Sequence, residues 1–310
     1  MLYRRKSDGQ ATVPKEAIGR LLCSSPVRVV ASVVGIAAFL GVGFAVGGEP
    51  SLLEYEFTAS DDPGGDEYWR NAVPGGDGTL DWTFDNANAA PVGVVGGNTD
   101  FSSAYDFGGA LPADPGYATS NSIADGTLSG TTVAFELWLA FGADVTDVSD
   151  LSGRQEVILE SGGAITGFSF LLNGPSLAFR TRRDGTNADV TIPVTDDMLG
   201  DFFQITGAIN PYVSNFGSGQ TRLFLNGRAT AATDDVQDWS GGNVAGLAAA
   251  NGAMGAVDSE TGWNAFAGQI ASVKYYDGDH SAGDVYESYI THVAGAADPE
   301  VDSLRAADAY

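Results

Sequence analysis

Beyond residue 50, hydrophobic and polar positions alternate with a period of two, and helical periodicity is almost absent. In residues 132–141, large apolar side chains occupy every second position: Phe135, Leu137, Leu139 and Phe141. This alternation predicts a strand. Gly, Pro, Asn and Asp separate further runs of strand length, at 156–160, 167–172, 176–182, 189–193, 202–209, 221–225 and 269–276. The chain is therefore expected to form many short strands.

Two local signals refine this picture. Asn226-Gly227 lies between two extended runs and predicts a two-residue hairpin turn. Near the end, Ser281 followed three residues later by Asp284 predicts the start of one short helix, with Val285, Tyr289 and His292 on one face. The predicted fold class is all-β, a two-sheet antiparallel jelly-roll sandwich with one small helix.

An apolar segment precedes this domain. Residues 29–46 carry no charge, and with two more glycines the segment 29–48 reaches the roughly 20 residues that cross a bilayer as a helix. Arginines precede it and glutamates follow it, which predicts a cytoplasmic basic segment at 1–28 and an extracellular domain, by the positive-inside rule. The expected organisation is an uncleaved anchor at 29–48, a sandwich at 49–292 and an acidic tail at 293–310. A cleavable signal peptide ending near Ala45-Val46-Gly47 is the alternative.

Charge narrows the range of partners. The chain has 40 acids and 15 bases, a net charge of −25, and residues 29–310 alone carry −29 with Lys274 as their single lysine. Nucleic acid is excluded as a natural partner by this balance. In molar salt, where the Debye length falls to about 3 Å, such carboxylates form a hydrated coat, so we interpret the protein as halophilic, archaeal or from an archaeal virus. An ordinary acidic secreted protein is the alternative.

The residues 51–290 resemble the laminin-G-like jelly-roll domains of the concanavalin A-like lectin/glucanase family. The segment TRLFLNGRAT is similar to the family's hairpin with its Asn-Gly turn, and WNAFAGQIASVKYYDGDHSAGDVYESY is similar to its closing strand and helix. Near the start, LLEYEFTAS, GGDGTLDWTF and AYDFGG look like its opening strands. Two departures are present: DFFQITGAIN lacks the family's Trp-His pair, and Ile270-Ala271 replaces its common Ile-Asp. The lost aspartate removes one acidic position of a family-style metal site.

The resemblance implies either a lectin or a glucanase, and the residues favour the lectin. Retaining glucanases of this fold carry Glu-x-Asp-x-x-Glu, which sets two carboxylates about 5–5.5 Å apart. That spacing is absent: Glu136 is alone on its strand, and Glu156 and Glu160 share a face without the intervening Asp. We therefore expect no enzyme activity. A Ser/His/Asp triad through His280 is left open, although a turn histidine beside the helix cap is the simpler interpretation.

Calcium is the metal worth considering, and no other cofactor is expected. Asp61 and Asp62 follow the first strand, while Asp277 and Asp279 follow the last. The laminin-G-like resemblance implies that these two ends lie close together, where their carboxylates would offer the oxygen ligands that calcium prefers. Surface charge typical of halophiles is the alternative interpretation.

Two kinds of residue are candidates for ligand binding. Arg180 and Arg182 point to one face of their strand and can grip a uronic or sulfated sugar, or else pair with neighbouring strand acids. Trp239 and Trp263, in turn-like contexts together with Trp82 and Tyr117, can stack on sugar rings or pack in the core.

The sequence thus favours a non-catalytic, membrane-anchored module that binds glycan or protein on a halophile surface. A structural subunit of a cell-surface assembly or of a membrane-containing virion, with packing into a homo-oligomer, is the alternative. A glycoside hydrolase ranks third.

Overall fold

The computed structural model describes ten segments of the chain: 52–73, 80–108, 115–121, 132–162, 167–183, 186–210, 220–233, 244–249, 262–278 and 280–293. The chain divides into the units Met1–Phe44 and Ala45–Tyr310, and every described residue belongs to the second. The expected anchor at 29–48, the basic segment 1–28 and residues 294–310 lie outside the described residues. Within the described segments, no helix has the length and apolarity needed to cross a bilayer.

The first sheet contains eight strands. Across the sheet they follow the order β14 (Arg228–Thr233), β13 (Gln220–Leu225), β12 (Phe203–Asn210), β7 (Val133–Phe141), β17 (Gly268–Asp277), β5 (Ser103–Asp106) and β4 (Val92–Gly93). The long strand β17 has β7 on one side, and on its other side β5 pairs with its start and β1 (Leu52–Thr58) with its remainder. All these pairs are antiparallel, and β7 and β17 form the centre of the sheet.

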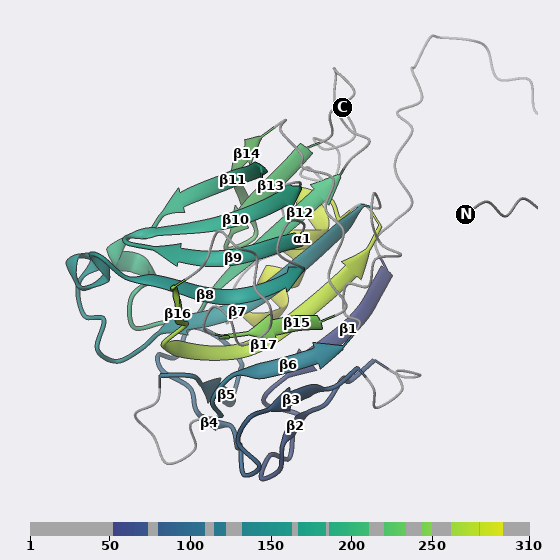
Figure 1. Cartoon of the computed structure of the whole chain (residues 1–310), viewed down its shortest axis with the longest axis vertical. Helices are drawn as coiled ribbons and strands as arrows, with labels where there is room; N and C mark the ends of the chain where they lie inside the picture. The colour runs from purple at the N-terminus through teal and green to yellow at the C-terminus, as the bar shows by residue number, and fades with distance from the viewer. Residues whose placement is uncertain are drawn as a thin grey trace, which may run out of the picture. The chain divides into compact units, whose positions relative to one another are not determined.

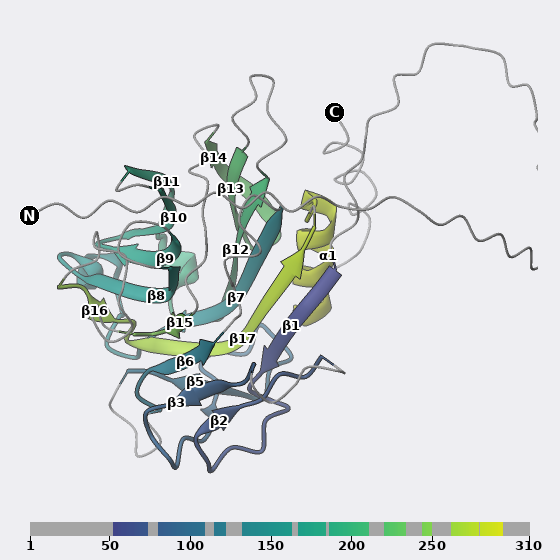
Figure 2. The same ribbon diagram turned by 45° about the vertical axis from the view of Figure 1, so that its right-hand side comes forward.

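The second sheet faces the first and contains nine strands. Their order is β11 (Thr186–Pro193), β10 (Ser176–Arg183), β9 (Gly167–Asn173), β8 (Gln155–Gly162), β15 (Val244–Leu247), β6 (Ala118–Asn121), β3 (Trp82–Phe84) and β2 (Tyr68–Trp69). These pairs are antiparallel, whereas the two-residue strand β16 (Asn264–Ala265) pairs with β8 in parallel. Figures 1 and 2 show the two layers, with β8 to β11 stacked over β12, β7 and β17. The predicted two-sheet sandwich is confirmed.

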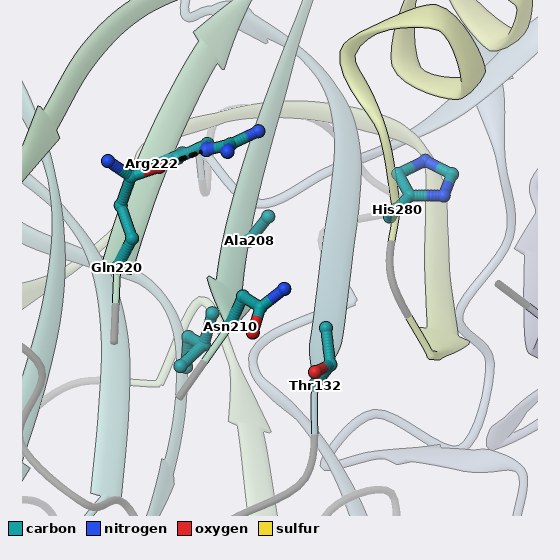
Figure 3. A pocket seen from close by; sticks show the side chains of 7 residues that line it. Thr132, Ala208, Asn210, Gln220, Arg222 and His280 are labelled. Atoms are coloured by element: carbon teal, nitrogen blue, oxygen red, sulfur yellow. Dashed lines mark hydrogen bonds between the residues drawn. The ribbon is translucent and has the colours of Figure 1, made fainter. Parts of the chain in front are cut away.

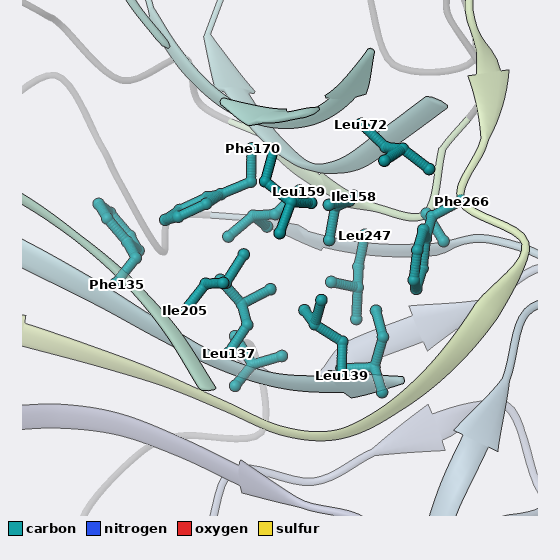
Figure 4. Packing of buried hydrophobic residues seen from close by; sticks show 14 of the residues in the cluster. Phe135, Leu137, Leu139, Ile158, Leu159, Phe170, Leu172, Ile205, Leu247 and Phe266 are labelled. Carbon is teal, nitrogen blue, oxygen red and sulfur yellow. The ribbon is translucent and has the colours of Figure 1, made fainter. Parts of the chain in front are cut away.

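The hydrophobic core fills the space between the sheets. Figure 4 shows Phe135, Leu137 and Leu139 of β7 facing Leu159 of β8 and Phe170 of β9. The stacked rings of Phe135 and Phe168 lie 4.2 Å apart, which joins the two sheets directly. Each such fully buried side chain stabilises the fold by roughly 1.5–3 kcal/mol. The period-two pattern that predicts the strands is thus the pattern that builds this core.

Helix α1 (Ala282–His292) covers the outer face of the first sheet. Ser281 accepts a hydrogen bond from the backbone N–H of Asp284, and the Asp284 side chain accepts one from the N–H of Ser281, so the predicted cap is present. Val285 packs on that face against Ala134, Ala208 and Phe224. Because α1 covers one face and the core the other, every residue of β7 is buried. Two short 3₁₀ turns, Val148–Leu151 and Asp196–Met198, complete the described helical structure.

The predicted Asn226-Gly227 hairpin is also confirmed. Both residues have positive φ, 50° and 76°, as the tight turn between β13 and β14 requires. Gly227 lies against the ring of Tyr286 on α1, where an added Cβ would come within 2.8 Å of that side chain. The turn therefore fixes the hairpin and leaves room for the helix at the same time.

Candidate functional site

The outer face of the second sheet carries three of the four residues predicted to bind a ligand. In β10, Leu177 and Phe179 point into the core, so Arg180 and Arg182 point to the opposite side. This confirms the expectation that both arginines share a face. Trp263 lies on this face too, whereas Trp239 lies outside the described residues.

A polar row crosses this face over four strands. The strand register places Glu160 of β8 opposite Ser169, Ser169 opposite Arg180, and Arg180 opposite Asp189 of β11. Arg180 Nε and Nη2 donate to the two carboxylate oxygens of Asp189 at 2.7 and 2.6 Å, a bidentate pair. The neighbouring Arg182 donates from Nη1 to Asn187 Oδ1 at 3.0 Å. Arg180 thus follows the interpretation in which it pairs with a neighbouring strand acid, whereas the hydrogen-bond partner described for Arg182 is the amide of Asn187.

This pairing changes what the face can recognise. The Arg180 side chain is 13% exposed and that of Asp189 34%, so the pair presents donors and acceptors together and little net charge. Glu160 and Ser169 are themselves buried, so the accessible part of this row is the Arg180–Asp189 pair. Such a pair suits the hydroxyl groups of a sugar better than a carboxylate or sulfate. Ser169 and Asp189 were missed by sequence reasoning because only the register of β8 to β11 aligns them with Arg180.

Trp263 lies beside this row on an apolar shelf. Its half-buried ring packs against Val157, Leu171 and Ala178, three small or aliphatic residues of β8, β9 and β10. Leu171 and Ala178 lie two residues along their strands from Ser169 and Arg180, a distance of about 7 Å. An aromatic ring beside a row of hydrogen-bonding groups is the arrangement that accommodates the apolar and polar faces of a sugar. Trp82, by contrast, is fully buried in the core.

The carboxylates of β8 do not form a catalytic pair. The expectation that Glu156 and Glu160 share a face is wrong, because a β-bulge between Val157 and Leu159 inserts one residue. Glu156 lies opposite Leu172, a core residue, whereas Glu160 lies opposite Ser169 on the outer face. Two carboxylates on opposite faces of one sheet cannot flank one glycosidic bond.

Glu156 has a structural partner at each oxygen. Its Oε1 accepts from Arg154 Nη1 at 3.4 Å and its Oε2 from the Ala267 N–H at 3.1 Å, which ties β8 to the chain entering β17. Burial raises the pKa of Glu156, and the hydrogen bond from Ala267 opposes that rise. The carboxylate therefore anchors a loop.

Glu136 is completely buried beneath α1. Its Oε1 accepts hydrogen bonds from Trp138 Nε1 at 3.2 Å and from the Ser288 hydroxyl of α1 at 2.9 Å. Burial, reinforced by the negative charge of Glu136, raises the pKa of Tyr276. This carboxylate is part of the contact between sheet and helix.

The predicted calcium cluster is divided by the strand register. β1 and β17 are antiparallel, with Thr58 opposite Ser272 and Leu52 opposite Asp277. Asp61 and Asp62 therefore follow the end of β1 that lies about 17 Å from Asp277, and the expectation that these ends come close is wrong. Asp279 lies outside the described residues. In the described part of the chain, no group of three or more acidic, histidine or cysteine side chains is placed to hold a metal ion.

The cation that lies beside Asp62 is the guanidinium group of Arg70. Arg70 Nη1 donates to Asp62 at 3.3 Å and Nη2 to Asp66, and the hydroxyl of Tyr105 also donates to Asp62. The hydrogen bond from Arg70 lowers the pKa of Asp66, while burial and Asp62 raise the pKa of Tyr105. These carboxylates act as internal partners of the loop after β1, and Asp61 is exposed next to them.

His280 immediately precedes the helix cap, as the simpler of its two interpretations states. Its ring is 4% exposed and stacks on Tyr276 with a centroid distance of 4.0 Å. Ala271 is buried with Trp138, Phe101 and Phe202 under α1. That position is thus part of an apolar cluster.

Comparison with known proteins adds a distant likeness. No protein-family model and no curated protein matches the sequence. Similar solved structures include the receptor-binding domain of botulinum neurotoxin type G (10% identity, TM-score 0.46) and the binding domain of serotype D (9%, 0.48). A serotype D domain in complex with N-acetylneuraminic acid is similar at 10% identity and a TM-score of 0.47. Each match covers 77% of this chain and 50–51% of the other, so the likeness spans about half of those chains. At such low identities and TM-scores, function has to be inferred from this chain's own residues.

Proposed function

We propose that this protein is a non-catalytic surface module that binds a glycan on the outer face of its second sheet. The observation that carries the proposal is Trp263 on its apolar shelf beside the partly exposed pair of Arg180 and Asp189. The separation of Glu156 and Glu160 by the β-bulge supports a binding role over glycoside hydrolysis. The paired charges of the row favour neutral sugar hydroxyls as the groups recognised.

The proposal includes display outside the cell by the apolar segment 29–48, with the N-terminus in the cytoplasm. Protease digestion of intact cells tests this part. Loss of the sandwich to added protease, with a short N-terminal fragment left in the membrane fraction, is the expected result. Recovery of a protein that begins near residue 48 would instead indicate a cleaved signal peptide.

Replacing Trp263 with alanine is expected to weaken glycan binding about tenfold, because the sugar loses its stacking surface. The measurement is an array of polysaccharides probed in molar salt with the full-length protein, followed by titration of the best ligand. Tyr68→Ala is the matched control, since Tyr68 is 37% exposed on the same sheet but four strands away from β8. Equal affinity of the Trp263 variant and the wild type would contradict the proposed site. If no polysaccharide binds and native mass spectrometry finds a stable oligomer, the alternative role as a structural subunit of a surface assembly or virion is favoured.

Stability is expected to rise with salt. Residues 29–310 carry a net charge of −29. Salt screens the repulsion among exposed carboxylates, because the Debye length falls from about 10 Å at 0.1 M to about 3 Å at 1 M. The midpoint of thermal unfolding should increase between 0.1 and 3 M KCl. Equal midpoints across this range would contradict halophilic adaptation.

A further inference from the structure

The two arginines of β10 differ in the residues that lie opposite them. The register places Asp189 of β11 beside Arg180, whereas it places Asn187 of β11 and Gly167 of β9 beside Arg182. Arg180 therefore has a carboxylate partner, while the cross-strand neighbours of Arg182 are an amide and a residue without a side chain. Because a guanidinium group stays protonated in proteins, Arg182 keeps a positive charge that no cross-strand neighbour offsets.

The hydrogen bonds of Arg182 leave part of its guanidinium group available. Its Nη1 donates to the amide oxygen of Asn187 at 3.0 Å, and no carboxylate of a described residue forms an ion pair with it, in contrast to Arg180. The buried Glu160 faces the same side of the sheet from β8, two strands or about 10 Å away from β10. Arg182 Nε is buried and has no hydrogen-bond partner among the described groups. A buried donor without an acceptor is unfavourable, so this position favours an acceptor that a ligand supplies.

Arg182 continues the proposed glycan site along β10. Trp263 packs against Ala178, and Arg180 and Arg182 follow on the same face of the strand at intervals of about 7 Å. Arg182 therefore lies about 13 Å from the shelf, which is more than the width of one sugar ring. A linear glycan that stacks on Trp263 and runs along β10 would place a different sugar residue at Arg182.

These features indicate the charge of the ligand. A guanidinium group presents its donors in a planar fork that fits a carboxylate, and Asn187 occupies only one nitrogen of this fork. The Arg180–Asp189 pair suits neutral hydroxyl groups, so the acidic group belongs to the neighbouring sugar. We infer that the glycan bound by this face contains uronic acid residues and that Arg182 binds the carboxylate of one of them. The inference rests on the proposed function and adds the class of glycan and the residue that selects it.

Calorimetric titration of the full-length protein, in molar salt and non-ionic detergent, tests the inference with hyaluronan, alginate and polygalacturonate. Each is compared with its carboxyl-reduced form, which keeps the sugar rings and their linkages but carries no charge. At least one of these polysaccharides is expected to bind, about tenfold more tightly than its reduced form. Because Arg182 is half-buried, salt screens its contact with a carboxylate less than it screens an exposed pair.

Asn187→Asp is the sharpest variant, because it keeps Arg182 and gives it the carboxylate neighbour that Arg180 already has in Asp189. It is expected to remove the preference for the charged polysaccharide over its reduced form, and Arg182→Gln is expected to do the same. Arg228→Gln is the matched control, since it removes one positive charge from β14 of the first sheet and should leave the preference intact. Thermal unfolding of each variant verifies that the fold is intact.

Other outcomes would overturn the inference. Equal affinity of the wild type for the charged and reduced forms would show that no carboxylate is recognised. A preference that survives in Arg182→Gln and Asn187→Asp would assign it to other residues, and its loss in Arg228→Gln would assign it to overall charge. In each case, loss of binding in Trp263→Ala would still support the proposed function, as would binding of neutral polysaccharides alone. If no polysaccharide binds, the inference and the proposed function both fail.

Discussion

Replacing Trp138 with alanine is expected to lower the free energy of unfolding by about 3–5 kcal/mol, the usual cost of deleting a large buried aromatic side chain. Trp138 is completely buried between the first sheet and α1. Its ring stacks on Tyr289 at 5.7 Å with an angle of 3°, and lies edge-on to Phe101 and His292. Denaturant titration in molar salt, followed by tryptophan fluorescence and circular dichroism, measures the change.

The same substitution also removes a hydrogen bond from a buried carboxyl group. Trp138 Nε1 donates one of the two hydrogen bonds that Glu136 Oε1 accepts, and Ser288 donates the other. A buried carboxylate that loses a donor keeps its desolvation cost, which adds to the loss of packing. Trp138→Phe is therefore expected to be intermediate, because it restores most of the packing but leaves the hydrogen bond unmade.

Trp263→Ala is the matched tryptophan control for this measurement. Its ring is half-buried against three residues of the second sheet, so truncation should cost about 1 kcal/mol or less. A Trp138 variant as stable as the Trp263 variant would show that α1 contributes little to the fold. In glycan binding we expect the reverse order, with Trp263→Ala weakening the affinity more than Trp138→Ala. The two measurements together distinguish a tryptophan that stabilises the fold from one that contacts the glycan.

Local patterns predicted the strands and the helix because each depends on nearby residues. The alternation at 132–141, the Asn226-Gly227 turn and the Ser281 cap are all confirmed by β7, the β13–β14 hairpin and α1. The short strands β2, β4 and β16 span two residues each, too few for a periodic signal, and were not predicted.

The errors arose where strand register decides the outcome. Regular alternation along a strand predicted that Glu156 and Glu160 share one face. The bulge after Val157 inserts one residue and moves Glu160 to the opposite face, and no residue type in this strand signals it. The antiparallel pairing of β1 with β17 likewise separates Asp62 from Asp277, which sequence order alone does not reveal. Thr132, Asn210, Arg222 and His280 line one small hollow on the first sheet (Figure 3), and only the order of its strands brings these distant positions together.

Gly207→Val is expected to lower the free energy of unfolding by about 3 kcal/mol, at the upper end of the cost of overpacking a core. Gly207 lies in the middle of β12, and its position faces the second sheet. A Cβ atom there would lie 2.7 Å from the rings of both Phe170 and Phe179. Since these rings are fully buried and packed on each other at 4.5 Å, they have little space to move.

Gly93→Val is the matched control, because Gly93 also lies in a strand of the first sheet but an added Cβ would meet nothing within 4 Å. Its unfolding free energy should remain within about 0.5 kcal/mol of the wild type. If Gly207→Val is equally neutral in denaturant titrations, the two sheets are not packed as closely at β12, β9 and β10 as described. If it is destabilising as expected, the glycine is required because β12 approaches the second sheet more closely than any side chain would permit.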